Sequence, residues 1–108
     1  MEITSRLAEN EVMVTLDTLR REKRAEILHL AQVHGAREIR VFGSVARGDN
    51  REESDVDLLV DFDKGRTLFD LIGLRLDLKE LLGAEVDIVT PGSLRYMRNR
   101  VLAEARPI

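Results

Sequence analysis

The residues from Ile39 to Val60, IRVFGSVARGDNREESDVDLLV, carry most of the information about how this chain folds. Alternating β-branched residues from Glu38 to Phe42 predict a strand, which Gly43 and Ser44 interrupt. A polar loop then leads into the segment from Asp55 to Phe62, where consecutive apolar residues predict a second strand that is buried on both faces. The stretch therefore predicts two strands joined by a tight turn and a loop, with acidic residues at the start of the second strand.

Capping residues and hydrophobic periodicity predict the remaining elements. They are a helix from Asp17 to about His34, a helical turn from Val45 to Gly48, a helix from Thr67 to about Leu82, a strand from Glu85 to Val89, and a helix from Ser93 to about Ala105. Helices and strands that alternate in this way indicate an α/β fold of the α+β type. We therefore predict a small mixed β-sheet with helices packed on it.

The predicted helix that begins at Thr67 has two apolar sides. Placing its residues at intervals of about 100° separates two stripes. They are Leu71, Leu74, Leu78, Leu81 and Leu82 on one side, and Phe69, Ile72 and Leu76 on roughly the opposite side. The first stripe can cover the sheet. The second stripe needs another cover, and the N-terminal helix, another subunit and a partner protein are the alternatives.

Length and composition indicate one small domain over residues 1–108, in which residues 1–16 are ambiguous between helix and strand. The net charge of −3 gives no reason to expect direct DNA binding. The chain has no cysteine, which excludes disulfides and thiolate zinc sites. We see neither a signal peptide nor an apolar run long enough to span a bilayer, and we expect a cytoplasmic protein that has no membrane partner.

Gly43, Ser44 and Arg47 form a candidate phosphate-binding turn. A strand that breaks at glycine lets a ligand approach the backbone, and the N–H groups of a following helical turn can bind an anion. The Ser44 hydroxyl adds a donor, and Arg47 can bind phosphate with its planar guanidinium. Gly-Ser pairs also occur in many ordinary turns. No Gly-Lys-Ser/Thr follows, so this turn is not a P-loop.

Asp55, Asp57 and Asp87 form a candidate metal site. Residues two apart on a strand point to the same face with Cα atoms about 6.5 Å apart, so the first two carboxylates can converge on Mg²⁺. Like charges at the start of an apolar strand are unfavourable unless a cation compensates them. Asp87, inside the segment EVDIV, joins them if that strand pairs beside the strand that begins at Asp55. The alternative is that these aspartates are solvated residues at strand ends.

Taken together, these residues resemble a known family. Gly43 and Ser44, ten intervening residues, Asp55 and Asp57, and a later strand with Asp87 are similar to the motif of the DNA polymerase β-type nucleotidyltransferases. The strings GSVARG and SDVDL resemble those of its minimal nucleotidyltransferase (MNT) branch, and the resemblance covers most of the chain. It implies a polymerase β-like nucleotidyltransferase fold.

The resemblance also implies roles for the residues of the motif. Gly43 and Ser44 would hold the triphosphate of the substrate ATP, with Arg47 as support. Asp55, Asp57 and Asp87 would bind Mg²⁺ and serve catalysis, with Asp87 as the base.

A function follows from the same resemblance. MNT proteins are similar to antitoxins paired with HEPN toxins, which are small helical ribonucleases, and in that family the antitoxin transfers AMP from ATP to a toxin tyrosine. At 108 residues we expect no extra domain to hold an acceptor, so the acceptor docks from outside. We therefore predict a protein adenylyltransferase that acts as an antitoxin in a hetero-oligomer. Two alternatives stay open, namely an antitoxin that only masks its partner and a nucleotidyltransferase with a small-molecule or RNA acceptor.

Overall fold

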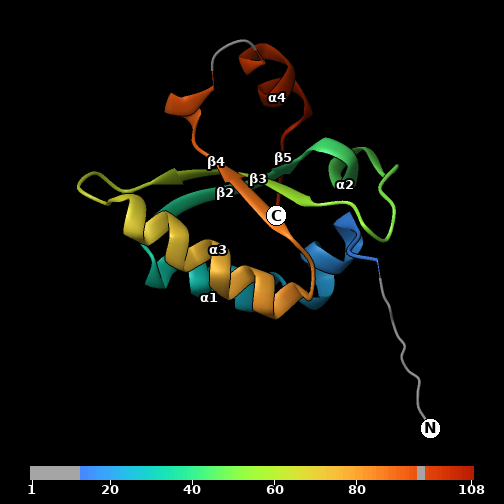
Figure 1. The fold of residues 1–108 in the computed structure, drawn as a ribbon, viewed down its shortest axis with the longest axis horizontal. Coiled ribbons are helices and arrows are strands. Elements are labelled where there is room, and N and C mark those ends of the chain that lie inside the picture. Colours follow the sequence, from blue (N-terminus) through green and yellow to red (C-terminus); the bar gives the residue numbers. More distant parts are fainter. Residues whose placement is uncertain (1–12, 95–96) are drawn as a thin grey trace, which may run out of the picture.

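The computed structural model describes residues 13–94 and 97–108, which are arranged around a β-sheet (Figure 1). Its strands are β2 (Ala36–Phe42), β3 (Val56–Phe62), β4 (Val86–Val89) and β5 (Arg106–Pro107), in the order β4-β3-β2-β5. β2 runs antiparallel to both β3 and β5, whereas β3 and β4 are parallel. The predicted mixed sheet is therefore confirmed.

Helices lie on both sides of this sheet. α1 (Arg24–Val33) and α3 (Leu68–Leu82) lie together on one side, and α4 (Arg98–Glu104) lies on the other, where it contacts α2 (Gly43–Arg47) (Figure 1). The described chain also contains a π-helix, η1 (Thr18–Glu22), and a 3₁₀ helix, η2 (Pro91–Ser93). The sheet therefore separates the α1–α3 layer from the side on which α4 lies.

The main hydrophobic core lies between the sheet and the α1–α3 layer. Val41, Leu58 and Ile88 belong to this core, together with Leu74 and Leu78 of α3. Successive side chains of a strand point to opposite faces, so the neighbours of these core residues in the strands face away from the core. Those neighbours are Phe42, Asp57 and Asp87. The core thereby directs two of the three predicted aspartates to the side on which α4 lies.

The two ends of α3 match the prediction because local signals determine them. The Thr67 hydroxyl accepts a hydrogen bond from the Phe69 N–H, and the Asp70 carboxylate accepts one from the Thr67 N–H. This reciprocal pair is a capping box. Gly83 ends the helix in the left-handed conformation, with φ at +66°.

The continuous helix predicted from Asp17 to His34 is wrong. Lys23, with φ at −116° and ψ at 0°, separates η1 from α1. The Asp17 side chain forms no cap, because the Thr15 hydroxyl accepts the hydrogen bond from the Thr18 N–H at 3.0 Å. Of the ambiguous N-terminal segment, residues 1–12 lie outside the described residues, and residues 13–15 form no regular element.

The helix predicted from Ser93 to Ala105 is shorter in the structure. Ser93 belongs to η2, where its hydroxyl donates to the Thr90 carbonyl, and Leu94 is extended. α4 begins at Arg98, and residues 95–96 lie outside the described residues. After α4 the chain forms β5, a short strand that the sequence did not predict, in which Arg106 pairs with Val41 of β2.

The second apolar stripe of α3 is exposed. Phe69 is 84% exposed, Ile72 is 42% exposed and Leu76 is 53% exposed. α1 contacts α3 but leaves these three side chains in solvent, so the N-terminal helix is not their cover. Another subunit or a partner protein remains as the alternative.

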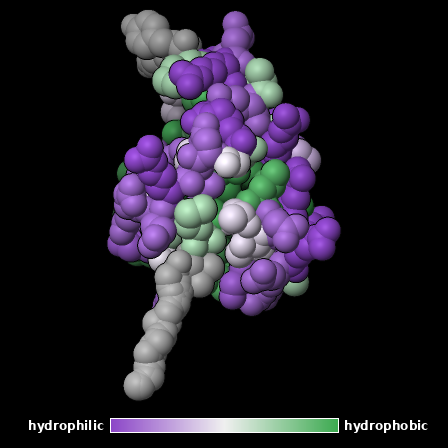
Figure 2. Space-filling view, turned by 90° about the vertical axis from the view of Figure 1, so that its right-hand side faces the viewer, coloured by the Kyte–Doolittle hydropathy of each residue, from purple (hydrophilic) through white to green (hydrophobic). Residues whose placement is uncertain are grey.

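Most of the surface drawn in Figure 2 is hydrophilic, which agrees with the 34% of charged residues in the sequence. On the face drawn in Figure 2, hydrophobic atoms gather in a hollow that hydrophilic residues surround. In the part of the chain that the structure describes, none of the helices combines the length and the apolar character needed to cross a membrane.

Candidate active site

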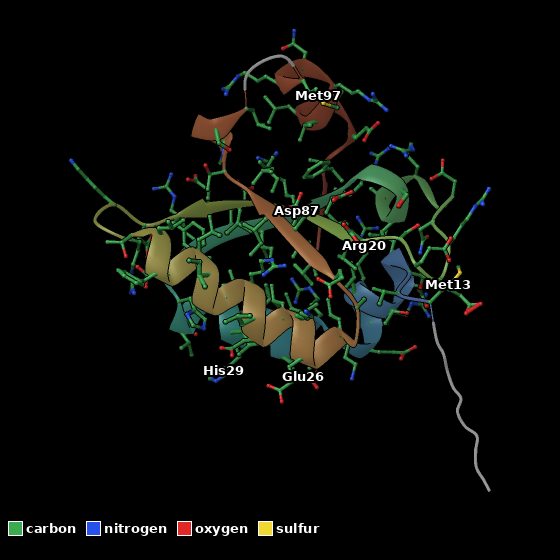
Figure 3. All side chains as sticks on the ribbon, in the orientation of Figure 1. Met13, Arg20, Glu26, His29, Asp87 and Met97 are labelled. Atoms are coloured by element: carbon green, nitrogen blue, oxygen red, sulfur yellow. The ribbon has the colours of Figure 1, made fainter. Side chains whose placement is uncertain are left out.

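Asp57 and Asp87 lie next to each other on parallel strands. The β3–β4 pairing places Asp57 opposite Asp87, so the two carboxylates share one face of the sheet. Figure 3 shows Asp87 on β4 with Met97, the residue before α4, above it, whereas His29 of α1 lies far below. Asp55, immediately before β3, is exposed. The sequence argument required these two strands to pair, and the structure shows that they do, in parallel.

The surroundings of Asp57 destabilise the charged form of its side chain. Partial burial, followed by the charges of Asp87 and Asp55, raises its pKa from the ordinary 3.8 to about 6. The charge of Arg47 acts in the opposite direction and is outweighed. A carboxylate in this position would be relieved by a bound cation, and a raised pKa of this kind is frequent at catalytic sites.

Gly43 brings the predicted phosphate-binding turn against Asp57. The β2–β3 register places Phe42 opposite Asp57, and Gly43 then begins α2 with φ at +74°. A Cβ atom at Gly43 would lie 2.4 Å from Asp57 Oδ2, so a larger residue would displace the Asp57 side chain. The backbone at Gly43 therefore lies against the Asp57 carboxylate, and this close approach needs glycine for both its conformation and its size.

Arg47, the last residue of α2, is held by two carboxylates. Its Nε donates to Asp49 Oδ2 at 3.2 Å, and its Nη1 donates to both oxygens of Glu104 at 3.2 Å. The hydrogen bond to Asp49 is the largest of the effects that raise the pKa of Arg47, so the guanidinium remains charged. Ser44 belongs to the same short helix.

These residues surround a pocket of about 250 Å³ between α2, β3 and α4. Its lining residues are Phe42, Gly43, Ser44, Arg47, Asp57, Met97, Arg100, Val101 and Glu104. Four of the six residues predicted from the sequence therefore line one pocket. Asp87 does not line this pocket but lies opposite Asp57, which does, and Asp55 lies immediately before β3.

A larger groove of about 800 Å³ lies elsewhere, between residues 52–54 and the C-terminal end of α3. None of the six predicted site residues lines it, and its walls carry Leu76 of the exposed stripe. We therefore locate the candidate active site at the smaller pocket, where the phosphate-binding turn and the aspartate pair meet.

Glu104 is the residue of this pocket that sequence reasoning missed. It comes from α4, and it accepts hydrogen bonds from the Gly43 N–H and from Arg47. The two partners are 61 and 57 residues away along the chain. The only sequence signal is that Glu104 is the sole acid between the arginines from Arg95 to Arg106, and this does not indicate its partners.

The carboxylates of Asp57 and Asp87 are of the chemical type that binds Mg²⁺. Mg²⁺ is bound in proteins by one or two carboxylates together with the phosphates of a substrate. The paired Asp57 and Asp87 supply two such carboxylates, and the raised pKa of Asp57 agrees with a partly buried carboxylate beside other acidic groups. Among residues 13–94 and 97–108, however, no three acidic or histidine side chains are already arranged as a metal cage.

Comparison with known proteins assigns this chain to a family. Residues 20–108 match the nucleotidyltransferase domain family. The protein adenylyltransferase MntA of Thermococcus cleftensis is 43% identical over 83 residues, which cover 77% of this chain and 84% of that protein. The predicted nucleotidyltransferase enzyme class is therefore confirmed.

Solved structures agree. One assigned as a minimal nucleotidyltransferase is 52% identical, has a TM-score of 0.77, and is matched over 88% of this chain and 97% of its own. Two more distant structures share the fold. A toxin–antitoxin pair with AMP-PNP is 21% identical with a TM-score of 0.65, and the match covers 77% of this chain and 69% of that chain. A tri-AMPylated Shewanella oneidensis HEPN toxin with its MNT antitoxin is 18% identical with a TM-score of 0.59, and the match covers 80% of this chain and 68% of that chain. The chain thus belongs to the nucleotidyltransferase domain family, in the minimal branch that includes protein adenylyltransferases such as MntA.

Proposed function

We propose that this protein transfers AMP from ATP to a hydroxyl group of a partner HEPN toxin and thereby acts as its antitoxin. The observation that carries this proposal is the pairing of Asp57 with Asp87 beside the turn at Gly43. The relative named protein adenylyltransferase MntA, and the distant relatives that bind AMP-PNP or pair with an AMPylated HEPN toxin, support the choice of reaction and of partner. A cytoplasmic location is part of the same proposal.

In this proposal the chain's own residues position the nucleotide. The Gly43 N–H and the Ser44 hydroxyl would donate hydrogen bonds to the triphosphate, because both residues line the pocket beside Asp57. Arg47 binds the same triphosphate as a charged fork. Catalysis of phosphoryl-type transfer depends mainly on such positioning and charge stabilisation.

Asp55, Asp57 and Asp87 would hold Mg²⁺, which neutralises phosphate charge and aligns the attacking and leaving oxygens. The acceptor hydroxyl oxygen forms a bond to the α-phosphorus, and the bond from that phosphorus to the bridging oxygen of the β-phosphate breaks. Pyrophosphate leaves, and the hydroxyl proton passes to Asp87, which is exposed next to Asp57. We propose tyrosine as the residue that carries the acceptor hydroxyl.

A second candidate function is neutralisation of the toxin by binding alone. The exposed stripe of Phe69, Ile72 and Leu76 favours it, because side chains of this size are typical of protein interfaces when they gather on one surface. This stripe lies on α3, on the other side of the sheet from α4. Binding and catalysis are therefore separable by mutation.

The test uses the purified protein, Mg²⁺, the product of the neighbouring gene, and ATP labelled at either the α- or the γ-phosphate. We expect the neighbouring product to acquire label from the α-position only, and to acquire none with Asp57→Asn. A tight complex without label would support neutralisation by binding. Absence of both label and complex would contradict both functions.

A further inference from the structure

Glu104 binds the same two groups that we propose for the triphosphate. Its Oε1 accepts a hydrogen bond from the Gly43 N–H at 3.2 Å, and both of its carboxylate oxygens accept from Arg47 Nη1 at 3.2 Å. A backbone N–H and a guanidinium are the donors that phosphate oxygens also use. An anionic side chain of this protein therefore stands where an anionic ligand is expected.

The carboxylate of Glu104 is ionised and well held in this position. Partial burial by itself raises its pKa, but the hydrogen bond from Gly43 and the charge of Arg47 together outweigh that effect, and the pKa lies below its ordinary value. The side chain is 21% exposed, so most of it is enclosed by the pocket. Such charge-assisted hydrogen bonds are stronger than those between neutral groups.

The size of the pocket supports displacement of this side chain. Sites for small molecules enclose about 300–1,000 Å³. The pocket beside Glu104 measures about 250 Å³, and Glu104 forms part of its wall. Withdrawal of the Glu104 side chain would widen the pocket at the point where Gly43 and Arg47 would become available.

A second partner for Glu104 is already in place. Arg100, one helical turn earlier on α4, donates from its Nε to Glu104 Oε2 at 3.4 Å. When Glu104 leaves Gly43 and Arg47, it can keep this ion pair on the surface of α4, so its charge does not lose every partner. The exchange therefore involves one carboxylate with two alternative sets of donors.

We propose that Glu104 occupies the position of a phosphate group in this conformation and must withdraw before the triphosphate can bind. This inference rests on the proposed nucleotide site. Nucleotide binding thus competes with an internal ligand carried by α4, and it is coupled to a change at the C-terminal end of that helix. The competing reading is that Glu104 is a permanent support that orients Arg47, and it predicts the opposite effect on affinity.

The test is calorimetric titration of the full chain with ATP and Mg²⁺, without an acceptor protein. Two variants distinguish the effect of the position of the Glu104 side chain from the effect of its charge. Glu104→Gln removes the charge, and Glu104→Asp keeps the charge but is one methylene shorter, so that it releases Gly43. Glu53→Gln is the matched control, because it makes the same chemical change on an exposed carboxylate outside the pocket. A melting curve for each variant checks that it is folded.

We expect both Glu104 variants to bind ATP at least about fivefold more tightly than the unmodified protein, because Glu104→Gln no longer forms the ion pair with Arg47 and Glu104→Asp no longer occupies the Gly43 N–H. Glu53→Gln should bind ATP with an affinity within about twofold of that of the unmodified protein. Unchanged or weaker binding by Glu104→Gln would overturn the inference and leave the proposed function standing. Tighter binding by Glu104→Gln alone would also overturn it, since a charge effect would then suffice. Absence of ATP binding by every protein tested would overturn the proposed function itself.

Discussion

Gly43 and Asp57 lie so close together that a Cβ atom on Gly43 would be 2.4 Å from Asp57 Oδ2. Gly43 also has φ at +74°, which side-chain-bearing residues rarely adopt. The two constraints coincide at the point where the proposed phosphate-binding turn meets the proposed metal-binding carboxylate. The pairing of β2 with β3 brings the two halves of the motif together, and glycine at position 43 allows their close approach.

Gly43→Ala is therefore expected to abolish AMP transfer and to lower the free energy of unfolding by about 1–3 kcal/mol. The loss of activity follows from displacement of the Asp57 side chain, and the loss of stability follows from the left-handed backbone. Gly83→Ala is the control, because Gly83 also has positive φ but nothing lies within 4 Å of its Cβ position. Chemical denaturation and the labelling assay measure the two effects. Equal activity of the two alanine variants would refute the role of the Gly43–Asp57 contact.

Asp57→Asn is expected to stabilise the metal-free protein while it removes activity. The pKa of Asp57 is raised to about 6 in the folded protein, so the folded state binds more protons than the unfolded state between pH 3.8 and about 6. The contribution of Asp57 to the free energy of unfolding therefore falls as pH rises through that window. Above that window the full cost of burying the Asp57 charge and of its repulsion by Asp87 and Asp55 is present. Solvent screens the partly exposed side chain, so the expected gain from Asp57→Asn is ~1 kcal/mol at pH 8.

Thermal unfolding in EDTA at pH 4.5 and pH 8 measures this gain. The control is Asp61→Asn on the same strand, where the carboxylate pairs with Arg37 at 3.1 Å and its removal relieves no repulsion. If Asp57→Asn melted below the unmodified protein at pH 8, the electrostatic account of the site would be wrong.

Arg47→Lys is expected to reduce kcat/KM for AMP transfer about tenfold with little change in stability. Lysine keeps the charge but lacks the planar fork with which Arg47 contacts both Asp49 and Glu104. Arg37→Lys provides the comparison, since Arg37 also donates from two nitrogens to one carboxylate, that of Asp61, outside the pocket. Steady-state kinetics in which the two variants behave alike would argue against a phosphate-binding role for Arg47.

Phe69→Asp and Ile72→Asp are expected to weaken the complex with the neighbouring gene product at least tenfold, without a change in ATP affinity or melting temperature. Both side chains are exposed, so the substitutions bury no charge in the core. Val33→Asp makes the same change at a 55% exposed residue of α1 and should leave the complex intact. Size-exclusion chromatography and calorimetry measure the effect, and an unaffected complex would exclude this stripe as the interface.

The sequence predicted the parts of the site that depend on local rules. The two-residue period of a strand, together with the pairing of β3 and β4, predicted that Asp57 and Asp87 share one face of the sheet, and Gly43 marked the end of β2. These outcomes follow from the period of a strand and from backbone sterics. The same locality explains the correct ends of α3 at Thr67 and Gly83.

The parts that the sequence did not predict depend on tertiary contacts. Glu104 reaches the site through a hydrogen bond to a residue 61 positions away, and β5 forms only because Arg106 returns to Val41. The break at Lys23 interrupts an otherwise regular helical pattern. No spacing rule in the sequence determines where α4 sits on the sheet, and hence none identifies the acid that it brings to Arg47.

Intact-mass spectrometry of the neighbouring gene product, after incubation with this protein, Mg²⁺ and ATP, tests the central claim most directly. We predict a mass increase of one or more whole adenylyl groups, release of one pyrophosphate for each group, and no increase with Asp57→Asn or Asp87→Asn. An unchanged mass in a sample that forms the complex and binds ATP would contradict the claim that this site transfers AMP to its partner.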